Sequence, residues 1–248
     1  MEFNYADILS THAYLVTASS IPSDLTAKVL ALSNVKRFQF KEYPPNVIVD
    51  NTFTHVLKCI HLTHFLQTHL NQTLLERILW IHDIPELTMG DVTVIEKSRS
   101  STLNKRLEAQ ELVISKSMLS SSDQILLQQF NTASTFLKGQ HAWDPELSCF
   151  EALLAKLIDN AEGNMTFHYF ITKWVNSDKF ADSLMPPTDS LIHTFVSNQR
   201  FKSIVQDTLA EEQDLVASSL IKCVLENVLY MWNTVPLERV PSAINKYL

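Results

Sequence analysis

Apolar residues recur at intervals of three and four positions along most of the chain, whereas the strict alternation of a half-buried strand is hard to find. This spacing predicts an all-α protein. The expected helices span residues 4–15, 23–34, 52–70, 73–83, 102–119, 122–137, 146–161, 164–175, 189–207 and 211–232.

Two proline pairs divide this helical pattern. Pro44-Pro45 separates the second expected helix from the third, and Pro186-Pro187 precedes the last two. We therefore expect a main domain over residues 1–180 and a C-terminal helical extension over residues 181–248 that packs on it. The apolar stripe of helix 211–232 fits either packing on the protein's own core or a subunit interface, which would make a homodimer.

Composition removes several classes of function. Three glycines in 248 residues leave little material for glycine-rich phosphate loops. A formal net charge of −7 without a basic run argues against extended nucleic acid as a partner. Three cysteines without CxxC spacing fit a reducing compartment. The sequence contains no apolar run long enough to suggest a membrane partner. We expect a cytoplasmic protein.

The densest chemistry lies in residues 80–92, which read Trp-Ile-His-Asp-Ile-Pro-Glu-Leu-Thr-Met-Gly-Asp-Val. His82 and Asp83 end an apolar helix, because Pro85 cannot continue it without losing a hydrogen bond. A buried aspartate beside a histidine has to be paired or to bind a cation. Imidazole and carboxylate together bind zinc, manganese, cobalt or iron.

Two ligands do not complete a metal site, so others have to come from elsewhere in the chain. His55 lies in the preceding expected helix, and Asp159 interrupts an apolar face of a later one. A carboxylate there is costly unless charged or hydrogen-bonded neighbours compensate it. Asp159 could instead be the structural ion-pair partner of Lys156 or Arg37.

The order His55, His82-Asp83, Asp159 resembles the H…HD…D signature of the HD superfamily of metal-dependent phosphohydrolases. The finer pattern of Glu86, Gly90-Asp91 and Lys97 after the His-Asp pair is similar to that of the HD-domain 5′-deoxynucleotidases. The resemblance covers roughly residues 30–175. It implies an HD-domain helical bundle, preceded by N-terminal helices and followed by additional C-terminal ones.

The resemblance also implies a role for each matching residue. One divalent metal ion (manganese, cobalt, zinc, iron or magnesium) would be held by His55, His82, Asp83 and Asp159. Glu86 and Asp91 would act as acid and base, and Arg37 and Lys97 would contact the substrate. Two departures affect the substrate pocket: Thr54 stands where the family has an acidic residue, and the family's prolines after Gly-Asp are absent.

The expected activity is therefore removal of phosphate from a small nucleotide, most simply the 5′-phosphate of a (deoxy)nucleoside monophosphate. The alternative is a catalytically weak HD module that binds a nucleotide and signals through its C-terminal helices. Structural readings of the same residues also remain open: Glu86 and Asp91 as ordinary turn acids, Lys97 as a solvated charge, and His82-Asp83 as a helix cap.

Overall fold

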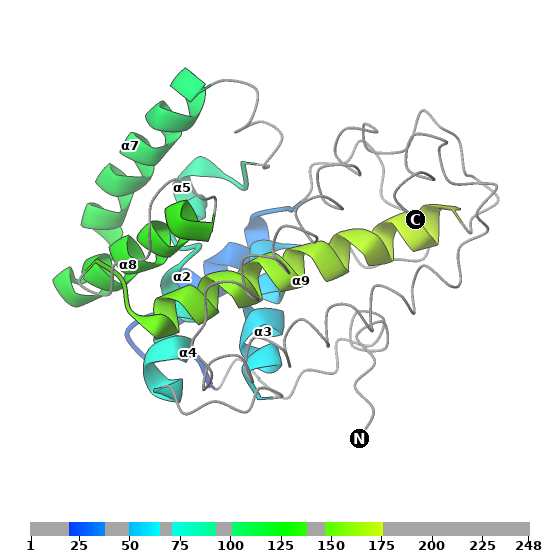
Figure 1. The fold of residues 1–248 in the computed structure, drawn as a ribbon, viewed down its shortest axis with the longest axis horizontal. Helices are drawn as coiled ribbons and strands as arrows, with labels where there is room; N and C mark the ends of the chain where they lie inside the picture. The colour runs from blue at the N-terminus through cyan, green and yellow to red at the C-terminus, as the bar shows by residue number, and fades with distance from the viewer. Residues whose placement is uncertain (1–19, 38–49, 65–70, 93–100, 138–146, 176–248) are drawn as a thin grey trace.

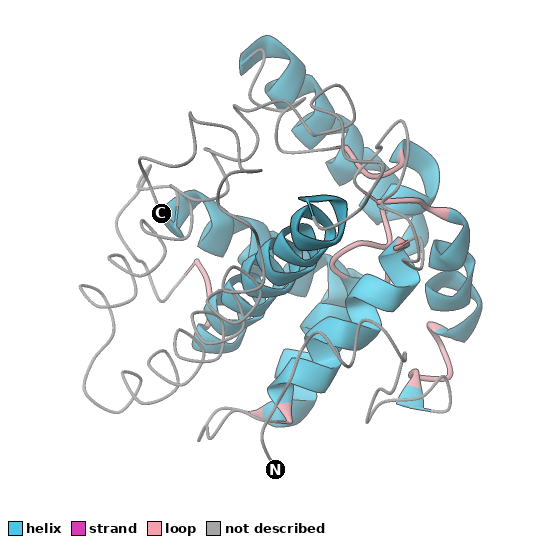
Figure 2. Cartoon of the chain, turned by 90° about the vertical axis from the view of Figure 1, so that its right-hand side faces the viewer, coloured by secondary structure: helices cyan, strands magenta, loops and turns pink. Residues whose placement is uncertain are grey.

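The computed structural model describes residues 20–37, 50–64, 71–92, 101–137 and 147–175. These residues form helices joined by short turns and contain no strand, only an isolated antiparallel bridge between Lys36 and Asn51 (Figures 1 and 2). The all-α class is thereby confirmed for this part of the chain. The helices are α2 (Thr26–Ala31), the 3-10 helix η2 (Leu32–Asn34), α3 (Thr52–Thr63), α4 (Gln72–Ile81), α5 (Glu86–Met89), α7 (Ser101–Met118), α8 (Ser121–Leu137) and α9 (Phe150–Val175).

The core lies where α9 crosses the other helices. The first half of α9 packs against α3, α4 and α8, and α4 in turn contacts α3 and α8 (Figure 1). Apolar side chains from all four helices are almost fully buried there, among them Ile60, Ile78, Ala133 and Ile158. Burial of such side chains stabilises the fold by roughly 1.5–3 kcal/mol for each large aliphatic group.

Local caps set where α3 and α4 begin. The side chain of Asn51 accepts a hydrogen bond from the Thr54 amide, and the Thr54 hydroxyl accepts one from the Asn51 amide, which completes a capping box. Asn71 caps α4 in the same way through the Leu74 amide. Thr54 therefore has a structural role at the start of α3.

The turn after α4 carries the densest motif. α4 ends at Ile81, and His82 is its C-cap residue, with its amide donating to the Ile78 carbonyl at 3.0 Å. α5 follows Pro85 directly and ends at Met89, and its C-cap residue Gly90 has a φ of +73°, a conformation that glycine adopts without strain. The expected position of His82 and Asp83 at a helix end is thus confirmed.

Several expected boundaries are wrong. Helices 146–161 and 164–175 are one continuous helix, α9, which begins at Phe150 and passes through Gly163. The Arg37 guanidinium lies against Gly163, 3.6 Å from where a Cβ would stand, so packing fills the space that the glycine leaves. α3 ends at Thr63, short of residue 70, with His64 as its C-cap. α2 begins only at Thr26 and closes in the 3-10 turn.

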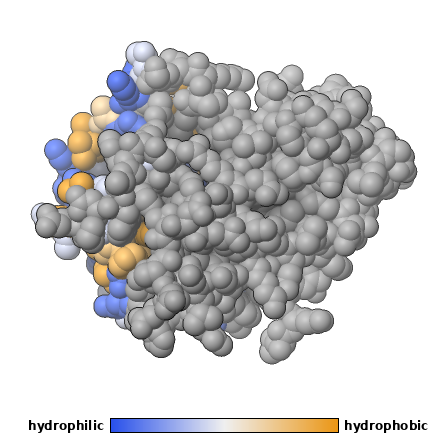
Figure 3. Space-filling model, in the orientation of Figure 1, coloured by the Kyte–Doolittle hydropathy of each residue, from blue (hydrophilic) through white to orange (hydrophobic). Residues whose placement is uncertain are grey.

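Other expectations lie outside the described residues: helices 4–15, 189–207 and 211–232, the extension 181–248, and Lys97. Within the described helices, none combines the length and the apolar character needed to cross a membrane. The visible described surface mixes apolar and hydrophilic residues (Figure 3), and exposed apolar side chains include Leu112 and Val113 of α7 and Ile125 of α8.

Candidate metal centre

His55 and His82 each have Nδ1 held by a neighbouring acceptor and present Nε2 to the same point. His55 comes from α3, and its Nδ1 contacts the carboxylate of Glu162. His82 comes from the end of α4, and its Nδ1 lies 2.8 Å from the carbonyl oxygen of Leu79. Because both partners accept hydrogen bonds, each Nδ1 carries a proton, and Nε2 is the nitrogen that each ring could offer to a cation. Burial and Arg37 act to lower the pKa of His55, but Cys59, Glu162 and the Asp159 hydrogen bond raise it well above its usual value, so a cation would displace a proton from this Nε2. The two Nε2 atoms lie 3.4 Å apart in the buried interior.

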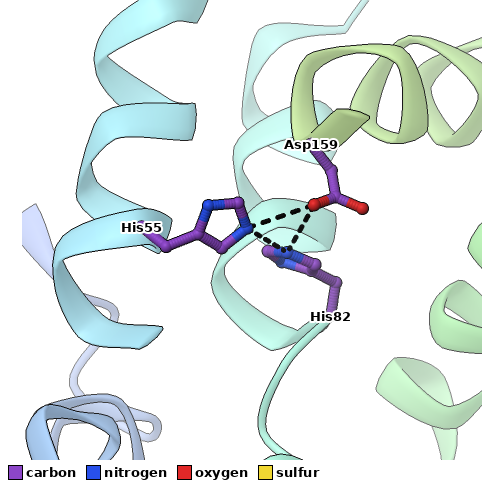
Figure 4. Close-up of side chains that lie close together, drawn as sticks. All are labelled: His55, His82 and Asp159. Atoms are coloured by element: carbon purple, nitrogen blue, oxygen red, sulfur yellow. Dashed lines mark hydrogen bonds and ion pairs between the residues drawn. The ribbon is translucent and has the colours of Figure 1, made fainter. Parts of the chain in front are cut away.

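Two carboxylates complete the group. The Nε2 of His55 lies 3.1 Å from Oδ1 of Asp159 and 3.5 Å from Oδ2 of Asp83. The Nε2 of His82 lies 3.1 Å from the same Asp83 oxygen and 3.9 Å from the same Asp159 oxygen. Figure 4 shows His55, His82 and Asp159 reaching the same point from three different helix segments. We call His55, His82, Asp83 and Asp159 the ligand set.

The spacing within the ligand set suits a single cation. Ligand atoms about 2.1 Å from one metal ion stand about 3.0 Å apart at right angles and about 3.4 Å apart at tetrahedral angles. The five separations that involve a histidine Nε2, 3.1–3.9 Å, fall in and just above this range. Imidazole nitrogens and carboxylate oxygens are also donors that first-row divalent metals accept. His55, His82 and Asp159 have ligand atoms close enough to one another to hold one metal ion, and Asp83 contacts both histidines of this group.

The two carboxylate oxygens of Asp159 contact different neighbours. Its Oδ1 faces the histidines, while its Oδ2 lies 2.6 Å from the Lys156 ammonium. The alternative pairing with Lys156 is therefore present together with the His55 contact, whereas the Arg37 ion pairs are with other acids. Burial alone would raise the pKa of Asp159, but Lys156 and the His55 hydrogen bond outweigh it and hold that pKa well below its usual value.

The pKa of the other aspartate, Asp83, is also held below its usual value. Burial acts to raise the pKa of Asp83, but the neighbouring His82 and His55 rings lower it further than burial raises it. On the side of α8, the Phe130 ring lies 5.2 Å from the His82 ring and 4.7 Å below the Lys156 ammonium, both measured to ring centroids. The Phe130 ring at this distance makes the α8 side of the ligand set apolar.

Glu86 and Asp91 stand near the ligand set. Glu86 opens α5, and its Oε2 accepts a hydrogen bond of 2.9 Å from the Thr52 hydroxyl at the start of α3. Burial and the charges of Asp83 and Asp91 together raise the pKa of Glu86 well above its usual value.

Arg37 lies behind His55 and takes part in an ion cluster that the sequence did not reveal. Its Nη1 is 3.0 Å from Glu162 and 3.3 Å from Asp50, and the fully buried Lys58 contacts the same two acids. We call Arg37, Asp50, Lys58 and Glu162 the buried ion cluster. Weak signals did exist, since Lys58 interrupts an apolar run and Glu162 follows Asp159 by three positions, one helical turn.

A second grouping near His55 is a poor metal site. His55, Cys59 and Glu162 also lie close enough to share an ion. A cation there would meet the Lys58 ammonium, which already contacts Glu162, and would displace the proton on Nδ1 of His55. Burial also raises the pKa of the Cys59 thiol to about 11, which disfavours the thiolate that metals bind.

A hollow of about 700 Å³ opens between α5 and α7. Its lining is mostly apolar and includes Met89 of α5 and Leu107, Val113 and Ile114 of α7, with Arg106 as the cation. Because Met89 is three residues beyond Glu86, the same short helix borders the hollow and carries a predicted catalytic acid.

No protein-family model, curated protein or solved structure matches this chain.

Proposed function

We propose that this chain is a metal-dependent phosphohydrolase of the HD type that acts on small nucleotides, with removal of the 5′-phosphate from (deoxy)nucleoside monophosphates as its reaction. The observation that supports it most is the approach of two imidazole Nε2 atoms to each other and to one oxygen each of Asp83 and Asp159, at separations of 3.1–3.9 Å and from three separate helix segments. The Lys156 ion pair accounts for one oxygen of Asp159 but not for the meeting of two imidazole rings with two aspartates.

In this proposal the ligand set holds one divalent cation. When bound, such a cation supplies charge for phosphoryl oxygens and lowers the pKa of water toward neutrality. The mixed nitrogen and oxygen donors do not select strongly among manganese, cobalt, zinc, iron and magnesium. The identity of the metal is therefore part of the experiment.

The acids beside the ligand set would move the protons. Glu86 would take a proton from the attacking water as its oxygen bonds to phosphorus, and Thr52 holds the Glu86 carboxylate in place for this step. Asp91 would position the ester oxygen that leaves, and the proton that Glu86 took from water would pass to that oxygen as its bond to phosphorus breaks. Burial acts to lower the pKa of Arg37, but the charges of Glu162 and Asp50, followed by those of Asp91 and Asp83, raise it, and Arg37 with Lys97 would offset phosphate charge.

The hollow between α5 and α7 would accommodate the nucleoside. Its apolar lining suits the face of a base, and Arg106 suits a polar edge. Replacing the exposed Ala109, which lines the hollow, by phenylalanine should raise KM for a nucleotide severalfold while the metal affinity stays unchanged. An unchanged KM would place the nucleoside elsewhere.

Phosphate release from a panel of nucleotides, with manganese, cobalt or magnesium added, tests the proposal directly. Asp83→Ala should lose both metal binding and turnover, because it removes a ligand. Glu86→Gln should keep the metal and lose turnover, because it removes only the proton acceptor. Glu108→Gln, at an exposed position of α7, is the matched control and should resemble the parent.

The result also separates the enzyme from the alternative. If the parent protein binds nucleotides tightly but no added metal stimulates phosphate release, the catalytically weak binding module is the better description. If the parent protein binds no divalent metal at all, the metal centre itself is refuted.

A further inference from the structure

Glu162 of α9 is a carboxylate with no exposed side-chain surface, and its polar neighbours include His55, Arg37, Lys58 and Thr166. Its Oε2 contacts Nδ1 of His55 and lies 3.0 Å from the Arg37 guanidinium. Its Oε1 lies 2.5 Å from the Lys58 ammonium and accepts a 2.5 Å hydrogen bond from the Thr166 hydroxyl. Both oxygens are therefore engaged, and the carboxylate has little freedom to turn.

The geometry of α3 and α9 produces this arrangement. His55 and Lys58 are three positions apart on α3, and Asp159 and Glu162 are three positions apart on α9, so each pair lies on one helix face. His55 contacts both acids, one through each ring nitrogen. A single helix therefore supplies a carboxylate to each side of the same imidazole.

The buried ion cluster is balanced without help from His55. Two cations, Arg37 and Lys58, face two carboxylates, Asp50 and Glu162, at distances of 2.5–3.3 Å. Such a cluster is costly to bury and is stable only when each charge is paired and hydrogen-bonded. Glu162 can therefore accept the Nδ1 proton of His55 while Arg37 and Lys58 offset its own charge.

We propose that Glu162, held by Arg37 and Lys58, is a positioning residue that orients His55 and fixes its tautomer so that Nε2 faces the bound cation. This inference rests on the proposed metal centre. A carboxylate that accepts the Nδ1 proton strengthens the imidazole as a ligand, and losing such a partner typically weakens metal binding 10–100-fold. Glu162 acts through His55, since the cations of the buried ion cluster surround its own oxygens.

The test compares Glu162→Gln with Asp50→Asn in the full chain. Both changes remove one buried carboxylate charge from the same cluster, but the side-chain contacts of Asp50 are with Arg37, Lys58 and Thr54, whereas Glu162 contacts His55. Cobalt or manganese affinity is measured by calorimetry, and the visible absorption of bound cobalt reports its coordination. Urea unfolding without metal reports stability.

Glu162→Gln should weaken metal binding by roughly 10–100-fold and change the cobalt spectrum. Asp50→Asn should change metal affinity less than threefold although it also lowers stability. If the two variants lose stability alike and keep equal metal affinity, Glu162 is only structural and the inference is refuted. If the parent binds no metal, the metal centre fails first, and the role of Glu162 fails with it.

A third variant covers the case in which Glu162→Gln does not fold. Combining Glu162→Gln with Lys58→Met removes one charge of each sign and keeps the cluster balanced. The double variant should fold more stably than Lys58→Met alone and still bind metal at least tenfold more weakly than the parent. Parent-like metal affinity in this double variant would equally overturn the inference.

Discussion

Replacing Lys58 by methionine should destabilise the fold by about 3–5 kcal/mol, because it breaks a buried ion pair by removing one partner. The ammonium lies 2.5 Å from Glu162, 3.1 Å from Asp50 and 2.8 Å from the Thr166 hydroxyl, with no exposed side-chain surface. Methionine has a similar length and is apolar, so the change removes the charge while leaving little empty volume.

The size of the loss follows from what stays behind. Glu162 and Asp50 keep Arg37 as a shared cation, but one positive charge then has to serve two buried carboxylates. An uncompensated buried charge accounts for most of the cost of breaking such a pair. Since domains of ordinary stability unfold at about 5–15 kcal/mol, the variant would lose a large share of the total.

The assay is urea unfolding with a chelator present, so that metal binding adds nothing to the apparent stability. At a slope near 3 kcal/mol per molar urea, the upper end of the usual range, a loss of this size moves the unfolding midpoint by roughly 1–2 M urea. Lys105→Met is the matched control, because Lys105 is exposed on α7. It should change stability by less than about 0.5 kcal/mol.

A double-variant cycle isolates the interaction itself. Lys58→Met combined with Asp50→Asn should cost at least about 1 kcal/mol less than the sum of the single changes, because each single change leaves the other charge unpaired. Strict additivity, or a Lys58→Met variant as stable as the Lys105→Met control, would refute the reasoning and the placement of these charges.

Three further predictions follow from contacts away from the buried ion cluster. Arg77 bridges α4 and α8 by paired hydrogen bonds to the buried Asp123. Arg77→Met should therefore lower the free energy of unfolding in urea by about 2–3 kcal/mol and leave metal affinity unchanged. A loss of metal affinity would contradict this. Burial lowers the pKa of His61 to about 4, helped by the nearby His64. The unfolded chain therefore takes up a proton below pH 6.5 that the folded chain refuses, and stability falls as the pH drops toward 4. His61→Gln should remove about 1–2 kcal/mol of the stability loss between pH 7 and pH 5, and equal pH dependence in parent and variant would rule it out. Thr52→Val removes the hydrogen-bond donor to Glu86. In a phosphate-release assay, turnover should fall roughly 10–100-fold while metal affinity stays constant. Parent-like turnover would exclude a catalytic role for this contact.

Local sequence signals predicted the features that local physics determines. Pro85 marked the end of α4 because proline cannot donate the next hydrogen bond, and the structure places His82 at that end as its C-cap. The apolar periodicity likewise located α7 and α8 to within one residue of their observed ends. The convergence of the ligand set required a different signal, the order of histidines and aspartates along the chain.

Features that depend on distant neighbours were not predicted. The sequence predicted two helices separated at residues 162–163, but α9 continues through Gly163. The Arg37 guanidinium, which comes from a segment 126 positions earlier, lies against this glycine. Lys58 and Glu162 lack charged sequence neighbours that would mark them as partners, since their pairing exists only after α3 and α9 pack together. Arg37 was predicted as a substrate contact, and that role stays a prediction beside its observed ion pairs.

The charged groups around Nδ1 of His55 differ in their net charge from those around Nε2. On the Nδ1 side the buried ion cluster is balanced among fixed side chains, so an added cation would upset a settled arrangement. On the Nε2 side the two carboxylates of the ligand set outnumber Lys156, the ammonium in contact with one of them, and Glu86 and Asp91 add further acidic character. A divalent cation would bring that side close to balance. In the proposed metal centre the same imidazole favours metal at Nε2 and disfavours it at Nδ1, which is why removing the Glu162 charge that contacts Nδ1 should change metal affinity without altering any ligand.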